Sequence, residues 1–190
     1  MQERLEPGVL MYSVEYPESS SRLLIFIRWI LAIPHAIILY LFGLAVGITT
    51  FIAWFAILFT GTYPRGLWDF AVSYQVWSAN LSAYLLFQRD EYPPFGAGDY
   101  PVQYDLVYPE RLSRGLIFIK FLLVIPHLIA LVVLGIVAYV VIILTWFAIL
   151  ITGRNPRGLF NFLVGVSRWA HRVNAYMYLL TDNYPPFSMD

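Results

Sequence analysis

An internal repeat is the strongest constraint on the fold of this chain. Residues 12–95 align with residues 104–187 at one constant offset of about 92 positions, without a gap, and roughly 38 of the 84 paired residues are identical. An ungapped match of this length indicates tandem duplication, so two similar substructures should be related by a pseudo-two-fold axis. We therefore divide the chain into two repeats, residues 1–98 and 99–190.

Each repeat contains a long apolar run, at residues 23–60 and 115–152. Only 13% of the chain is charged, whereas a water-soluble domain carries about a quarter charged residues. The composition predicts an integral, multi-pass membrane protein. Lysines and arginines balance the acidic residues, which argues against a nucleic-acid partner, and the absence of cysteine excludes disulfides and thiolate chemistry.

The apolar runs are too long for one perpendicular crossing, since about 38 residues of helix extend about 57 Å and the hydrocarbon core is roughly 30 Å thick. In one interpretation each run folds back near Gly43 or Gly135 into a Pro-kinked hairpin, which is re-entrant if its tip stays in lipid. In the other, residues 23–33 lie in the interface, the chain turns at Pro34, and residues 36–60 cross once.

Charge separates these two interpretations. Hairpins place all twelve lysines and arginines on one side of the membrane. Single crossings invert the second repeat and split the cations about seven to five, with Arg4 in the larger group. Because an uneven distribution of cations orients membrane proteins, we expect hairpins, with both termini in the cytoplasm.

The stretches that precede the apolar runs alternate between apolar and polar residues. Residues 10–16 and 100–108 follow this period of two and are bounded by Pro17 and Pro109. Such alternation predicts a short extended segment, of the kind found in an edge strand.

The segments after the apolar runs have helical periodicity. Apolar residues three and four positions apart cover residues 67–86 and 159–180, and their length and aromatic content predict amphipathic helices in the membrane plane. Tyr-Pro-Pro-Phe, at residues 92–95 and 184–187, ends each repeat because consecutive prolines cannot continue a helix. The predicted fold class is an all-α integral membrane protein of two tandem repeats, each with an extended segment, a membrane hairpin and an interfacial helix.

Two sets of charged residues lie near the apolar runs. Arg28 and Lys120 lie about two turns inside them, where long side chains can extend to the interface. Asp90 and Asp182 precede the Tyr-Pro-Pro-Phe segments, and we expect them in solvated loops.

The candidate cofactor ligands are His35 and His127, at equivalent positions in the two apolar runs. Two imidazoles facing each other across the pseudo-axis would suit a haem iron or another metal. The alternative is that each histidine hydrogen-bonds a carbonyl freed by the adjacent proline. The sequence favours this structural role, so we predict no cofactor and no bound metal.

Candidate contacts to lipid or to a partner come from basic and aromatic side chains. Two arginines, each followed by a glycine, lie at predicted helix N-termini, where they can hold a lipid phosphate. Three further basic residues form a patch on the second helix of the second repeat, which suits anionic lipid or a protein partner. Tryptophans favour membrane interfaces. The predicted contact residues are Arg65, Arg157, Arg168, His171, Arg172, Trp77 and Trp169.

No catalytic motif accompanies these residues. The chain has no glycine-rich phosphate loop, no His-Glu-x-x-His and no nucleophile elbow, so we predict that it is not an enzyme. The first hypothesis is an accessory or scaffold protein that packs in a membrane complex or against a second copy. The alternatives are a membrane-shaping or anionic-lipid-binding protein, and a redox subunit that uses His35 and His127.

The conserved blocks within the repeats carry a family resemblance. In the first repeat they are Tyr-Pro-Glu, Ser-Arg, Pro-His, Phe-Ala-Ile-Leu, Thr-Gly, Pro-Arg-Gly-Leu and Tyr-Pro-Pro-Phe, and each recurs in the second. In this order they resemble the bacterial membrane family catalogued as domain of unknown function 4389, over nearly the whole chain. The resemblance implies a bacterial inner-membrane location and no particular activity, cofactor or catalytic residue.

Overall fold

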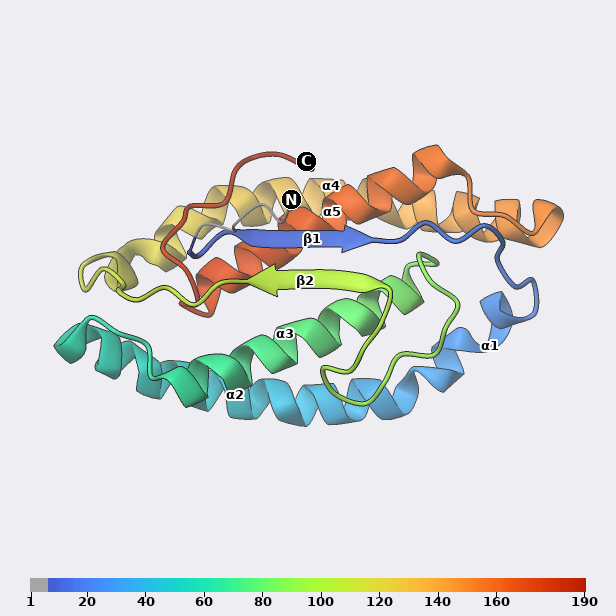
Figure 1. Cartoon of the computed structure of the whole chain (residues 1–190). Helices are drawn as coiled ribbons and strands as arrows, with labels where there is room; N and C mark the ends of the chain where they lie inside the picture. The colour runs from blue at the N-terminus through green and yellow to red at the C-terminus, as the bar shows by residue number, and fades with distance from the viewer. Residues whose placement is uncertain (1–6) are drawn as a thin grey trace, which may run out of the picture.

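The fold repeats one order of elements twice. A computed structural model describes residues 7–190, so Arg4 and the N-terminal residue lie outside the described part. The elements are β1 (Leu10–Val14), α1 (Leu24–Leu31), α2 (Ile33–Thr60), α3 (Arg65–Leu85), β2 (Val102–Leu106), α4 (Leu116–Thr152) and α5 (Arg157–Met177). Figure 1 shows that each strand is followed by a long helix and then by a shorter one, as expected of a duplicated chain.

The long helices do not fold back, so the predicted hairpins are wrong. Helix α4 runs unbroken for 37 residues through Pro126, and only Ala32 separates α1 from α2. Gly135 lies within the helix as an ordinary residue. A Cβ on Gly43 would lie 3.1 Å from the hydroxyl of Tyr74, so this glycine allows α3 to approach α2 closely instead of forming a turn.

The two long helices contact each other near their ends. Phe26, near the start of α1, packs edge-on against Trp146 near the end of α4, with ring centroids 5.3 Å apart. The equivalent pair, Trp54 and Phe118, has centroids 5.1 Å apart. The start of each long helix therefore lies against the end of the other, which makes them antiparallel.

The extended segments form a sheet that joins the repeats. Strands β1 and β2 pair antiparallel with Tyr12 opposite Tyr104 at the centre. The prediction of extended segments is confirmed, but the fold is mostly helical with a two-stranded sheet instead of all-α. Alternate residues face inward and are buried, whereas Ser13, Gln103 and Asp105 are exposed on the outer face.

Helices α3 and α5 form a layer between the sheet and the long helices. Helix α3 packs on α2 and β2, and α5 packs on α4 and β1; Figure 1 shows the strands in front, with α2 along the lower edge and α4 at the back. No residue of α3 after Phe70 is exposed. The predicted helix after each apolar run is confirmed, and it packs against the sheet on one side and a long helix on the other; its position at a membrane interface stays a prediction.

The repeats are interlocked through hydrogen bonds that cross between them. The amide of Ser20 donates to the carbonyl of Gly153 at 2.9 Å, and the amide of Leu112 donates to that of Gly61 at 2.8 Å. Gly61 and Gly153 end the long helices in the left-handed conformation, with φ of 74° and 71°. The loop that enters each long helix therefore closes on the end of the other, so the repeats share one structure.

Each long helix is buried along only one narrow stripe. In α2 the stripe consists of His35, Leu39, Val46, Ala53 and Ile57. The stretches Leu24–Thr60 and Leu116–Thr152 are long and apolar enough to cross a membrane, and only 17% and 11% of their most apolar portions are buried. Large apolar side chains are exposed along the whole length of both, from Leu23 to Phe59 and from Phe118 to Ile151.

Candidate functional site

Each conserved histidine lies in an aromatic cage. The indole N–H of Trp77 donates to Nδ1 of His35 at 2.9 Å. The ring of Phe95 stacks on the imidazole with 4.1 Å between centroids, and Tyr92 packs against it at 4.9 Å. His35 is completely buried. Because Nδ1 accepts a hydrogen bond, the ring proton is assigned to Nε2.

The second repeat builds the same cage around His127. Trp169 donates to its Nδ1 at 3.0 Å, Phe187 stacks on it at 3.9 Å, and Tyr184 lies 4.8 Å away. Every ring of each cage comes from the same repeat as its histidine. The structure therefore encloses His35 and His127 separately and does not join them in one site. Within residues 7–190, no three His, Cys, Asp or Glu side chains are grouped to hold a metal ion.

The Tyr-Pro-Pro-Phe segments close these cages over the proline turns. The hydroxyl of Tyr92 donates to the carbonyl of Leu31 at 3.0 Å, three residues before Pro34. Tyr184 makes the same bond to Leu123. Proline disturbs the hydrogen bonds of the preceding helical turn, and these hydroxyls supply a donor there. The expected bond from each histidine to a freed carbonyl is not formed through Nδ1, because that atom accepts from a tryptophan.

Trp77 and Trp169 are not surface residues. Their exposed fractions are 6% and 7%, because both indoles point at a histidine inside the fold. Both tryptophans were predicted to contact lipid or a partner, but their indoles lie inside the protein. The signal in the sequence was their equivalent position in the two repeats together with the paired histidines.

Arg28 and Lys120 form buried ion pairs. Arg28 is completely buried and donates to Asp90 at 2.6 Å and to the carbonyl of Tyr84. Lys120 pairs with Asp182 at 2.8 Å and donates to a backbone carbonyl at 2.6 Å. Both side chains turn inward to these partners and not outward along the apolar helix surface. The two aspartates are partners of these cations instead of solvated loop residues.

Arg65 and Arg157 remain exposed near opposite ends of the molecule. The guanidinium of Arg65 lies 4.6 Å from the ring of Tyr108, and that of Arg157 lies 4.5 Å from the ring of Tyr16. Each arginine thus stacks on a tyrosine of the other repeat. Arg65 also pairs with Asp69 at 3.1 Å. Their exposed guanidinium groups are placed where they can contact a phosphate.

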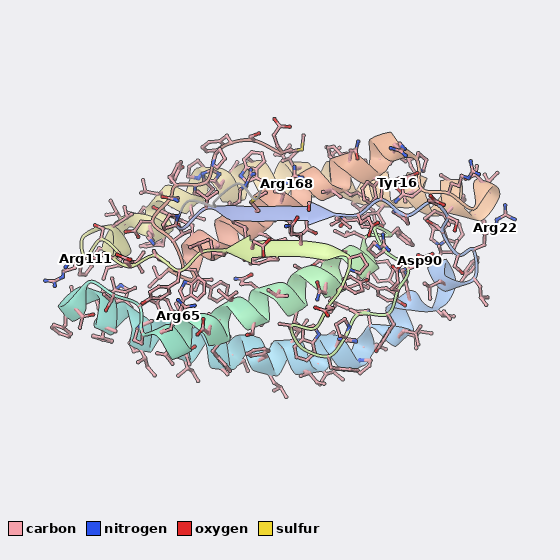
Figure 2. The ribbon with its side chains drawn as sticks, in the orientation of Figure 1. Tyr16, Arg22, Arg65, Asp90, Arg111 and Arg168 are labelled. Atoms are coloured by element: carbon pink, nitrogen blue, oxygen red, sulfur yellow. The ribbon has the colours of Figure 1, made fainter. Side chains whose placement is uncertain are left out.

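Of the predicted basic patch on α5, Arg168 and Arg172 line one surface pocket beside β1, whereas His171 is turned inward. Arg168 donates to the carbonyl of Tyr12 at 2.8 Å (Figure 2), and Arg172 is half-buried beside a pocket of about 360 Å³. His171 is buried, with its ring 4.9 Å from Tyr12 and 5.7 Å from Tyr104. Burial lowers the pKa of His171 to about 4, so it is neutral near pH 7.

A buried polar cluster lies between the sheet and the middle helices. Tyr12 donates to Gln88 at 3.4 Å, and Gln88 donates to Ser167 at 3.3 Å. Burial raises the pKa of Tyr104 far above its usual value. The sequence did not reveal this cluster, because its residues come from separate segments and because Gln88 and Ser167 have no identical counterpart in the other repeat.

Comparison with known proteins identifies one family. The sequence model of the family described as domain of unknown function (DUF4389) matches twice, over residues 22–97 and 114–189. Comparison with curated proteins and with solved structures yields no match. The two matched segments contain both aromatic cages and both buried ion pairs.

Proposed function

The chain belongs to the DUF4389 family, and from that premise we propose that it is a non-enzymatic scaffold embedded in the bacterial inner membrane. The family description assigns no activity, so the proposal depends on the surfaces of the molecule. It concerns a protein that holds a partner at the membrane instead of transforming a substrate.

The observation that carries this proposal is the apolar surface of the long helices. Only 17% and 11% of their most apolar portions are buried, whereas the core helix of a water-soluble protein is mostly enclosed. An uninterrupted apolar surface of this extent favours contact with lipid or with another apolar protein surface. Embedding in a membrane supplies that contact along the full length of both helices.

The scaffold role is supported by how the polar side chains are used. His35 and His127 accept hydrogen bonds from tryptophans, and Arg28 and Lys120 are paired with aspartates. These groups stabilise the fold and leave no assembled catalytic constellation among them. The outer face of the sheet, with a polar groove beside Ser13, Asp99 and Gln103, is a surface where a membrane protein or a second copy can dock.

Membrane extraction and native purification test the proposal together. The tagged chain should stay in the membrane pellet after an alkaline carbonate wash and should purify in mild detergent at a fixed ratio to a membrane protein or as a defined oligomer. Release by carbonate would contradict membrane embedding. Purification as a monomer with no partner at a fixed ratio, by native mass spectrometry, would contradict the scaffold role.

Binding to anionic lipid is a second candidate, favoured by the exposed cations at both ends of the molecule. Arg65 and Arg157 are the first residues of α3 and α5, directly after the loops that follow the long helices, and both side chains are exposed. Arginine suits phosphate because its planar guanidinium donates two parallel hydrogen bonds. Vesicles with phosphatidylglycerol should bind more protein than phosphatidylcholine vesicles, and the R65Q/R157Q variant should lose this difference. Equal binding to both vesicles would contradict the second candidate.

A further inference from the structure

The apolar surface of each long helix is longer than the hydrocarbon core of a bilayer is thick. A helix of 37 residues is about 55 Å long, against roughly 30 Å for the hydrocarbon core. Burying that full length in a crossing orientation requires a tilt of about 57° from the membrane normal, beyond the 0–40° seen for transmembrane helices. Exposed apolar side chains continue to both ends, so no part of either helix is suited to project into water.

The position of the sheet is a second, independent argument against a membrane-crossing orientation of the molecule. Figure 1 shows the strands near the middle of the long axis, and their outer face exposes Ser13, Gln103 and Asp105 together with Met11. If the long axis crossed the membrane, this polar face would lie at the centre of the hydrocarbon core. A carboxylate there costs about 2.5–3.5 kcal/mol or more, and strand edges facing lipid are not tolerated.

We infer that the molecule lies flat in one leaflet, with α1, α2 and α4 parallel to the membrane plane and the sheet facing water. This inference rests on the proposed membrane embedding and commits the apolar face to one occupant, the acyl chains of a single leaflet. A helix is about 10–12 Å across, and half of the hydrocarbon core is about 15 Å thick, so the pair fits within one leaflet. The orientation replaces the multi-pass arrangement expected from the sequence.

Symmetry and charge agree with this orientation. The pseudo-two-fold axis passes through the centre of the sheet, where Tyr12 lies opposite Tyr104. With this axis along the membrane normal, the two repeats have the same depth in the leaflet. Arg22 and Arg111, at opposite ends of the molecule in Figure 2, then face the same layer of lipid phosphates. All the cations of residues 7–190 share one compartment.

Single-cysteine labelling tests the orientation directly, because the natural chain has no cysteine. Glu18 and Glu110 are equivalent, exposed positions in the loops that contain the two ends of the molecule, and Gln103 marks the sheet. E18C, E110C and Q103C are treated with a membrane-impermeant maleimide in intact spheroplasts and in inverted vesicles. We expect all three to react from the same side. Reaction of E18C and E110C from opposite sides would overturn the inference.

Fluorescence quenching provides a second measurement. Tyr40 lies near the middle of the long helix formed by α1 and α2, Phe59 lies at its end, and their exposed fractions are 68% and 73%. A fluorophore on Y40C and on F59C should be quenched equally by lipids that carry a spin label at the same depth. Deeper quenching of Y40C than of F59C would overturn the flat orientation. The carbonate wash decides membrane embedding separately, since it reports retention and not sidedness.

Discussion

The imidazole of His35 lies parallel to the phenyl ring of Phe95, with 4.1 Å between centroids and 9° between planes. The same relationship joins His127 to Phe187. The Pro-His and Tyr-Pro-Pro-Phe motifs, about sixty positions apart in each repeat, are therefore two parts of one structural unit. In both repeats this unit is held by ring packing and by the hydrogen bond that the tryptophan donates to Nδ1 of the histidine.

The tryptophan of each cage should be needed for stability. W77F removes the N–H that donates to His35 and leaves a buried acceptor unpaired, which costs about 1–3 kcal/mol. Trp146 is half-buried, and its contact described above is the edge-on packing of its ring against Phe26, which a phenylalanine ring can keep. W146F is the control and should unfold within about 1 kcal/mol of the natural chain. Thermal unfolding in detergent measures both, and equal losses would contradict the role of the hydrogen bond.

The buried ion pair of the first repeat should contribute far more than an exposed pair. D90A leaves the completely buried guanidinium of Arg28 without its carboxylate, and removing one partner of a buried pair costs about 3–5 kcal/mol. The control is D69A, which breaks the exposed pair with Arg65 and should cost less than about 1 kcal/mol. Chemical unfolding in detergent compares them. Losses of similar size would show that Asp90 is not essential to the burial of Arg28.

His171 should make stability depend on pH in a defined window. Its pKa is lowered from 6.5 to about 4 by burial, so between these values the unfolded chain binds a proton that the folded chain does not. Stability contributed by neutral His171 is fully present above pH 6.5 and decreases as the pH falls toward 4, by at most about 3 kcal/mol. H171L should show a smaller decrease between pH 7 and pH 5 than the natural chain. Parallel pH profiles for the two proteins would contradict this prediction.

The two halves should assemble only together. Residues 1–98 and 99–190 are joined by the β1–β2 ladder and by the bonds from Ser20 to Gly153 and from Leu112 to Gly61. Expressed as separate chains in one cell, the halves should co-purify through a tag on one of them. A half that purifies alone as a monomer and unfolds cooperatively would show that each repeat is an independent domain.

The sequence predicted the elements of this fold better than their arrangement. The repeat, the extended segments and the helices after the apolar runs follow from local periodicity and proline positions. The hairpins were wrong because Gly43 and Gly135 were interpreted as turn formers, although helical hydrogen bonding continues through both. The pairing of β1 with β2 was not predictable from periodicity, since it depends on contacts between repeats.

The candidate site shows the same limit. The sequence drew attention to His35 and His127 as candidate cofactor ligands, but it did not show that the hydrogen-bond donor to His35 is Trp77, which comes from another helix. The inward direction of Arg28 depends on Asp90, which lies 62 positions later in the sequence. A charged residue in an apolar run and a matched aspartate in a loop are separate signals until the fold brings them together.

The crossing bonds between the repeats also determine when the protein can become complete during synthesis. The amide of Ser20 finds its acceptor, the carbonyl of Gly153, only after α4 has been made. The apolar helix of the first repeat therefore leaves the ribosome without the neighbour that covers its ends. Since contacts distant in sequence form late and slowly, this apolar helix is made before its own second half exists, and under the proposed membrane embedding lipid would cover it in the interval.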